Sequence, residues 1–98
     1  MFAILYDVAA LDDLSRVRLF EARRIIDEVR DQLARAPTRS NRRRKRLEAL
    51  VSPWEGARPL WQLRVGEFRV FYDVDDDLRQ VVVRAVRRKG RNRTEEIL

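Results

Sequence analysis

Two short strands joined by a tight turn are most plainly visible in the segment Trp61-Gln62-Leu63-Arg64-Val65-Gly66-Glu67-Phe68-Arg69-Val70-Phe71-Tyr72-Asp73-Val74. Apolar and polar residues alternate on both sides of Gly66-Glu67, which is the pattern of half-buried strands around a hairpin turn. Because successive strand side chains point to opposite faces, Leu63 and Val70 share one face and Arg64 and Arg69 share the other. We therefore expect a hairpin with one apolar face and one basic face.

Further strands and a helical region surround this hairpin. Asp75-Asp76-Asp77 predicts a turn, and the valine-rich segment Gln80–Arg87 predicts a strand near the middle of the sheet. Upstream, Phe2–Val8 predicts a strand, and apolar residues at three-to-four spacing predict one long helix, or two with a bend, over residues 10–35. We expect a single α+β domain over residues 1–98, with an N-terminal strand and helices packed on a small antiparallel sheet that ends in a three-strand meander.

The middle of the chain gives weaker signals. Pro37 ends the helical pattern, and residues 38–41 have the composition of a loop. Residues 42–47 lead into a short helical or irregular stretch that we expect before Ser52-Pro53, and residues 53–59 predict a connection rather than a core element.

Positive charge is concentrated in two tracts. The chain has 22 basic and 16 acidic residues, a net charge of +6, but residues 1–34 hold five arginines against seven acids. Residues 35–46 carry seven basic groups and residues 84–93 carry six, with no acid in either tract. Such localised charge favours a polyanionic partner, either nucleic acid or an acidic protein segment. The alternative is a solvated basic surface that only maintains solubility.

Two residue types are missing from the sequence. It contains no cysteine and no histidine, which excludes thiol nucleophiles, disulfides, serine–histidine triads and histidine–zinc sites. We expect no cofactor and no metal. No apolar stretch approaches the ~20 residues that span a bilayer, and the N-terminus lacks the charged start of a secretory signal, so we expect a cytoplasmic protein without a membrane partner.

The basic face of the hairpin is the candidate site. It presents Gln62, Arg64, Arg69 and Phe71, beside the basic end of the last strand. Guanidinium groups for phosphates and an aromatic ring for stacking are what a single-stranded RNA site requires. The alternative is that Arg69 pairs with an acid of the hairpin and Phe71 is an ordinary core residue.

Residues 60–98 also resemble a known protein family. The hairpin quoted above, followed by Val83-Arg84-Ala85-Val86-Arg87-Arg88-Lys89-Gly90, is similar to the RelE/ParE superfamily of bacterial type II toxin–antitoxin toxins. In that superfamily a Gly-x-aromatic-Arg-Val turn lies between the second and third strands, and a basic tract follows the fourth. The resemblance implies a cognate antitoxin partner, with DNA contacted only through the antitoxin complex. It also implies either ribosome-dependent mRNA cleavage, as in the RelE branch, or gyrase inhibition, as in the ParE branch.

The resemblance also suggests roles for individual residues and favours the RelE branch. It implies that the catalytic residues are Arg69, Arg64, Arg88 and Lys89. The residues expected to bind RNA of the mRNA or the ribosome are Gln62, Phe71, Arg84, Arg87, Arg91, Arg43 and Lys45. The chain ends without the tyrosine or histidine often found at the C-terminus of such enzymes. A catalytically silent module that binds RNA or antitoxin therefore remains a further alternative, beside gyrase inhibition.

Overall fold

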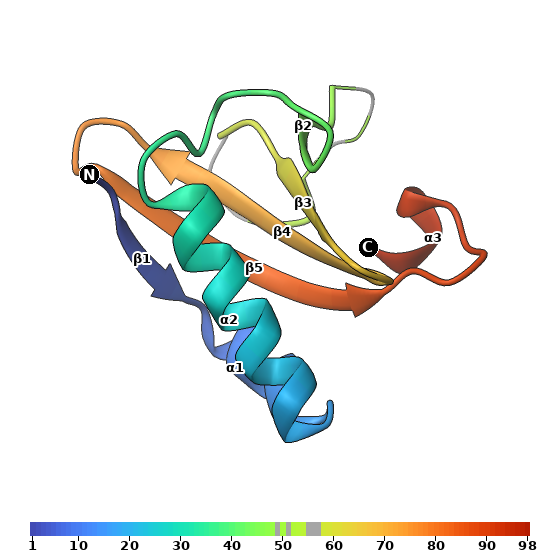
Figure 1. Cartoon of the computed structure of the whole chain (residues 1–98). Coiled ribbons are helices and arrows are strands. Elements are labelled where there is room, and N and C mark those ends of the chain that lie inside the picture. The colour runs from blue at the N-terminus through green and yellow to red at the C-terminus, as the bar shows by residue number, and fades with distance from the viewer. Residues whose placement is uncertain (49, 51, 55–57) are drawn as a thin grey trace.

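The computed structural model describes residues 1–48, 50, 52–54 and 58–98. Within these residues the chain forms one five-stranded sheet with strand order β1-β5-β4-β3-β2, and three helices (Figure 1). In chain order the elements are β1 (Ala3–Tyr6), α1 (Val8–Ser15), α2 (Leu19–Leu33), β2 (Arg44–Arg46), β3 (Trp61–Val65), β4 (Phe68–Asp75), β5 (Gln80–Arg88) and α3 (Thr94–Ile97).

The predicted hairpin and meander are confirmed. β3 and β4 pair antiparallel with Leu63 opposite Val70, and the turn between them contains Gly66. Gly66 has a φ of 58°, a left-handed conformation that glycine adopts without steric cost. β5 pairs antiparallel with β4, as expected, and the predicted α+β class is confirmed. The structure adds that β1 runs parallel to β5, so the sheet is mixed.

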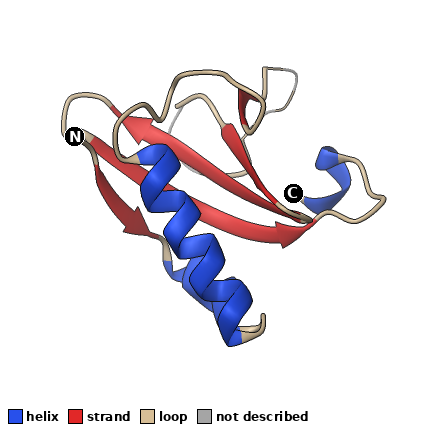
Figure 2. Ribbon diagram, in the orientation of Figure 1, coloured by secondary structure: helices blue, strands red, loops and turns tan. Residues whose placement is uncertain are grey.

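Two helices occupy the region where the apolar periodicity predicts either one helix or two. Figure 2 shows the break between α1 and α2. Arg18 precedes α2 with an extended backbone, and its amide donates to the Glu21 carboxylate at 3.4 Å, which helps to start the new helix. The buried residues of α2 are Ala22, Ile25, Val29 and Leu33, so one apolar stripe of the helix faces the sheet.

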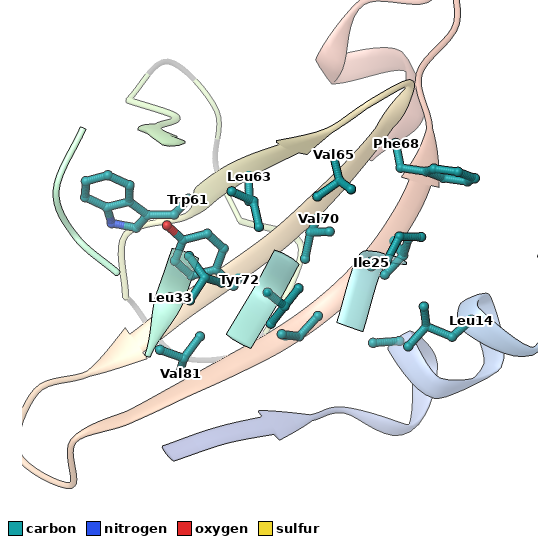
Figure 3. Packing of buried hydrophobic residues seen from close by; sticks show 14 of the residues in the cluster. Leu14, Ile25, Leu33, Trp61, Leu63, Val65, Phe68, Val70, Tyr72 and Val81 are labelled. Carbon is teal, nitrogen blue, oxygen red and sulfur yellow. The ribbon is translucent and has the colours of Figure 1, made fainter. Parts of the chain in front are cut away.

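The main hydrophobic core lies between α1, α2 and one face of the sheet. In Figure 3, Leu14, Ile25 and Leu33 of the helices meet side chains of β3, β4 and β5. Tyr72 is fully buried there and donates its hydroxyl hydrogen to the Pro37 carbonyl, and its ring stacks against Trp61 with centroids 6.3 Å apart. The helices therefore cover the Leu63 and Val70 face, and the Arg64 and Arg69 face points away from them.

Arg44–Arg46 forms the edge strand β2, where the sequence predicts no strand, and the helical or irregular stretch expected before Ser52 falls partly outside the described residues. The Asn41 side chain accepts hydrogen bonds from the amides of Arg43 and Arg44, which turns the chain into the strand. The Arg44 side chain then donates to the carbonyls of Gln32 and Ala36 at the end of α2, where a helix leaves carbonyls unpaired. Contacts with distant parts of the chain thus stabilise a strand of three consecutive basic residues.

The connection predicted over residues 53–59 falls partly outside the described residues, since residues 55–57 are not among them. None of the helices in the described ranges has the length and apolar character that a membrane span requires.

Candidate nucleic-acid interface

The sheet face opposite the helices is divided into two regions, and the first is apolar. Phe71 and Ala85 of the sheet are buried there together with Leu47 and Leu60. Trp54, Ile97 and Leu98 pack against this cluster, so segments before β3 and at the C-terminus cover the middle of the face. The expectation that Phe71 is an open stacking platform is therefore wrong. Its side chain is fully buried, because the chain folds back over it.

The second region is a hollow that we call the basic groove. It has a volume of about 200 Å³, and its lining residues come from the loop before β2, from β2, β3 and β4, and from the segment after β5. These residues are Asn41, Arg42, Arg43, Lys45, Gln62, Arg64, Arg69, Lys89 and Thr94. Six of these nine described residues are arginine or lysine and none of the nine is acidic, so they offer an anion several positive groups.

A row of arginines crosses the sheet at this groove. Arg69 of β4 lies directly opposite Arg64 of β3 and directly opposite Arg87 of β5. Like charges in directly opposite positions destabilise a sheet, so the Arg64–Arg69 pair is costly in the free protein, whereas Arg87 is paired with Asp13. Burial, and secondarily the positive charge of Arg64, lower the pKa of the Arg69 guanidinium. An anion bound between these side chains would relieve the repulsion.

Arg69 is held in position by backbone carbonyls. Its Nη1 donates to the carbonyl of Gly66 at 3.0 Å and to that of Phe68 at 2.8 Å, both in or beside the β3–β4 turn. These bonds orient the guanidinium without neutralising it. The tight turn of the hairpin therefore fixes the direction of this arginine.

Most cations of the groove have no acidic partner. Among the described residues, no carboxylate forms an ion pair with Arg42, Lys45, Arg64, Arg69 or Lys89. Arg43 is paired with Glu28 of α2, with 3.1 Å between Nη1 and Oε2. No three carboxylates of the described part of the chain are grouped so that they could hold a metal ion. The site is thus suited to a phosphate-bearing polymer.

Comparison with known proteins decides the family. The model of the family described as the ParE toxin of type II toxin–antitoxin system, parDE, matches residues 4–93. The chain belongs to this family. The resemblance to the RelE/ParE superfamily that the hairpin and the basic tract predict is thereby confirmed. No curated protein matches the sequence of the toxin.

Solved structures of RelE toxins share the fold of the toxin. A RelE–RelB complex from the archaeon Pyrococcus horikoshii aligns with a TM-score of 0.70 at 22% identity, covering 92% of this chain and 97% of that one. The RelBE2 toxin–antitoxin complex of Mycobacterium tuberculosis aligns with a TM-score of 0.68 at 22% identity, covering 87% and 94%. The isolated RelE toxin of E. coli aligns with a TM-score of 0.63 at 15% identity, covering 98% and 93%. At these identities the likeness establishes the fold.

Six of the residues that the sequence predicts for the site lie together in the structure of the toxin. Arg64, Arg69, Lys89, Gln62, Arg43 and Lys45 all line the basic groove. The N-terminal basic tract reaches the groove because β2 pairs with β3, which places Lys45 opposite Gln62. Gln62 is buried, and its Oε1 accepts a hydrogen bond from the Thr94 hydroxyl at 3.1 Å, so it anchors α3 at the edge of the groove.

Three arginines of β5 that the sequence predicts for the site, Arg84, Arg87 and Arg88, form ion pairs with acidic residues and do not line the groove. Arg84 binds Asp73 at 2.8 Å and Asp7 at 3.1 Å, and the hydrogen bond that it donates to the Asp73 carboxylate is the main reason that its pKa is raised. Arg87 pairs with Asp13 of α1. The Asp13 carboxylate also accepts a hydrogen bond from the Val86 amide at 2.9 Å, and so it pairs with the edge of β5 beyond the end of β1. Neither side chain lines the groove.

Arg88 lies on the helix side of the sheet. It pairs with Glu21 and Glu67, and its guanidinium lies 4.5 Å from the centroid of the Phe68 ring. Its predicted place beside Arg69 in a catalytic cluster is wrong, because alternate residues of β5 face opposite sides of the sheet. Arg91 is exposed in the segment after Gly90 and does not line the groove.

Three residues of the groove, Asn41, Arg42 and Thr94, are not among the predicted site residues. Asn41 and Arg42 lie within the basic tract of residues 35–46, so the charge pattern contains a signal for Arg42. No local signal identifies Thr94, because its position depends on the fold of the C-terminal segment against Gln62.

Proposed function

We propose that the toxin is a ribosome-dependent mRNA endonuclease and that the basic groove binds the phosphate at the cleaved bond. The observation that carries this proposal is the juxtaposition of Arg64, Arg69 and Lys89 in a hollow whose described lining residues include no carboxylate. A carboxylate lining would repel RNA, whereas clustered cations stabilise the additional negative charge that develops on phosphorus in the transition state.

The chemistry that suits this groove is attack by the ribose 2′-oxygen on the adjacent phosphorus. The 2′-hydroxyl loses its proton, a bond forms from the 2′-oxygen to phosphorus, and the bond to the leaving 5′-oxygen breaks, leaving a cyclic phosphate and a 5′-hydroxyl. Arg69, oriented by the Gly66 and Phe68 carbonyls, is suited to contact the equatorial oxygens of the phosphate. Arg64 and Lys89 add charge from either side.

A cognate antitoxin is the proposed protein partner. The Mycobacterium tuberculosis structure is a toxin–antitoxin complex and the Pyrococcus horikoshii structure is a RelE–RelB complex, and the matching family is one of toxins of type II toxin–antitoxin systems. The surplus of basic residues suits an antitoxin segment rich in acidic residues.

The test is primer extension on a reporter mRNA in a reconstituted translation system. Wild-type protein is expected to cut the mRNA at codons occupied by the ribosome. Arg69→Ala is expected to reduce cutting by about 10²-fold or more, as for the loss of one transition-state donor. Arg88→Ala removes the same side chain from the opposite face of the sheet and is expected to cut like wild type. Absence of cuts with wild-type protein, or equal loss in both variants, would refute the proposal.

Gyrase inhibition is the second candidate, and the observation that favours it is the match to the ParE toxin family. A DNA supercoiling assay with purified gyrase and the purified toxin tests it. Inhibition by the wild type, with no cutting of translated mRNA, would select gyrase as the target. A protein that binds RNA with neither activity would instead be a silent binding module.

A further inference from the structure

A second hollow adjoins the basic groove on the other side of the β3–β4 turn. It has a volume of about 320 Å³ and is lined by Arg24, Glu28, Arg43, Arg64, Val65, Gly66 and Arg69. We call it the turn hollow. Three arginines, Arg43, Arg64 and Arg69, line both hollows, so one continuous basic surface runs from the open face of the sheet to the side of α2.

Arg24 defines the far end of this surface. Its guanidinium packs on the turn at Gly66, where Nη1 lies 3.0 Å from the position that a Cβ atom would take. Because Gly66 has no side chain, the Arg24 guanidinium can lie directly against the turn. Arg24 forms no ion pair with any carboxylate in the described ranges, although α2 carries acidic residues within helical reach. An exposed arginine held against a turn without an acidic partner leaves its charge available to a ligand.

Glu28 and Arg43 mark the boundary of the turn hollow. Glu28 lies one helical turn after Arg24 and is the one carboxylate among the described residues that line either hollow. It pairs with Arg43 at 3.1 Å, so this arginine is shared between the acid and any anion in the groove. The negative charge of Glu28 repels phosphate within the hollow.

We propose that the turn hollow is a second phosphate subsite, in which Arg24 binds the backbone of a single-stranded RNA that continues from the basic groove over the β3–β4 turn. That the polymer is RNA rests on the proposed function. The present proposal adds where the bound strand lies and how long it is. Consecutive phosphates of an extended strand require cations in line, and Lys89, Arg69, Arg64 and Arg24 supply them along the two hollows.

The experiment measures binding of fluorescent 2′-O-methyl oligouridylates, which attack by a 2′-oxygen cannot cleave. The oligonucleotides are lengthened one nucleotide at a time from the dinucleotide, and each is titrated with wild type, Arg24→Ala and Arg23→Ala. Arg23 is the matched control, because it is an exposed arginine of the same helix that lines neither hollow. Both variants remove one positive charge, so the long-range electrostatic change is equal in the two.

Wild-type affinity is expected to rise with length until the strand reaches Arg24. Arg24→Ala is expected to bind the long oligonucleotides about tenfold more weakly, as for the loss of one hydrogen bond to a charged group, and to bind the dinucleotide like wild type. Its slope of log affinity against log salt should be smaller by about 0.7 for the long strands only. Glu28→Gln, which releases Arg43 and removes the repelling charge, should bind long strands more tightly.

Equal affinities of Arg24→Ala and Arg23→Ala for every length would overturn the subsite, and so would wild-type binding that does not depend on length. These outcomes are separate from failure of the proposed function. A toxin that does not cut mRNA but shows the length-dependent effect at Arg24 would keep the subsite and lose the nuclease. A toxin that cuts mRNA without that effect would keep the nuclease and lose the subsite.

Discussion

The two faces of β4 differ in how closely local sequence describes their environment. Phe68, Val70, Tyr72 and Val74 face the helices, and all four are buried in one continuous core. The opposite face shows Arg69, Phe71 and Asp73, which lie in three different environments within five residues of strand. Arg69 lines the basic groove, Phe71 is buried under distant segments, and Asp73 is buried in an ion-pair cluster with Arg58 and Arg84.

The difference teaches that alternation identifies which side chains share a face and does not identify what covers that face. An amphipathic helix can be recognised from the periodicity of its own sequence, so the sequence of α2 indicates a helix with an apolar stripe that can cover the Val70 face. The opposite face is covered in part by loop segments and by a four-residue helix, whose sequences carry no comparable pattern. The basic groove lies where these segments no longer cover the sheet face.

The largest expected effect comes from Phe71→Ala, which tests whether this residue belongs to the fold or to the site. Removing a fully buried ring should lower the free energy of unfolding by about 3–5 kcal/mol, because a cavity is left in the apolar cluster. Urea unfolding monitored by circular dichroism measures this change. If Phe71→Ala does not fold, Phe71→Leu should show a smaller loss of the same sign. Wild-type stability combined with weakened RNA binding would instead support the stacking role.

A smaller effect is expected from Tyr72→Phe on the helix-covered face. In this variant the Pro37 carbonyl no longer receives the buried hydrogen bond from the Tyr72 hydroxyl. The free energy of unfolding should therefore fall by about 1–3 kcal/mol. Burial also raises the pKa of Tyr72 above its ordinary value of 10.0. The native state then holds its proton more tightly than the unfolded state, so this contribution is present below pH 10 and is lost as the pH rises above it.

Unfolding free energies of wild type and Tyr72→Phe across alkaline pH measure the second part of this prediction. The variant should lose stability less steeply above pH 10. It should retain some of the dependence, because burial raises the pKa of Tyr6 to about 12. Identical alkaline profiles would show that the Tyr72 hydroxyl is not protected by the core.

The smallest effect, and the one of opposite sign, is expected from Arg69→Gln in the basic groove. Removing the charge that lies directly opposite Arg64 should raise the unfolding free energy by about 0.2–1 kcal/mol at low salt. The gain should shrink at high salt, since salt screens exposed charges. Arg23→Gln on the surface of α2 is the control and should show no such gain. A loss of stability that does not depend on salt would make Arg69 a structural residue.

Sequence by itself determined the hairpin, the meander and the family. Strand alternation around Gly66 gave the register of β3 and β4 and placed Arg64 and Arg69 on the same face. The apolar periodicity over residues 10–35 predicted helical structure with a buried stripe, and the turn and basic tract identified the superfamily. These features depend on residues close together in the chain, so local patterns contain the information.

Only the tertiary structure decided how the site is assembled from these parts. β2 forms because Arg44 reaches the carbonyls at the end of α2, and this strand carries Lys45 and the preceding arginines to the groove. Alternation along β5, shifted by an irregularity opposite Phe71 and Tyr72, turns Arg88 away from Arg69. The C-terminal segment buries Phe71 and brings Thr94 to Gln62. Each of these outcomes depends on contacts between residues far apart in the chain, for which the local pattern of charge and hydrophobicity carries no signal.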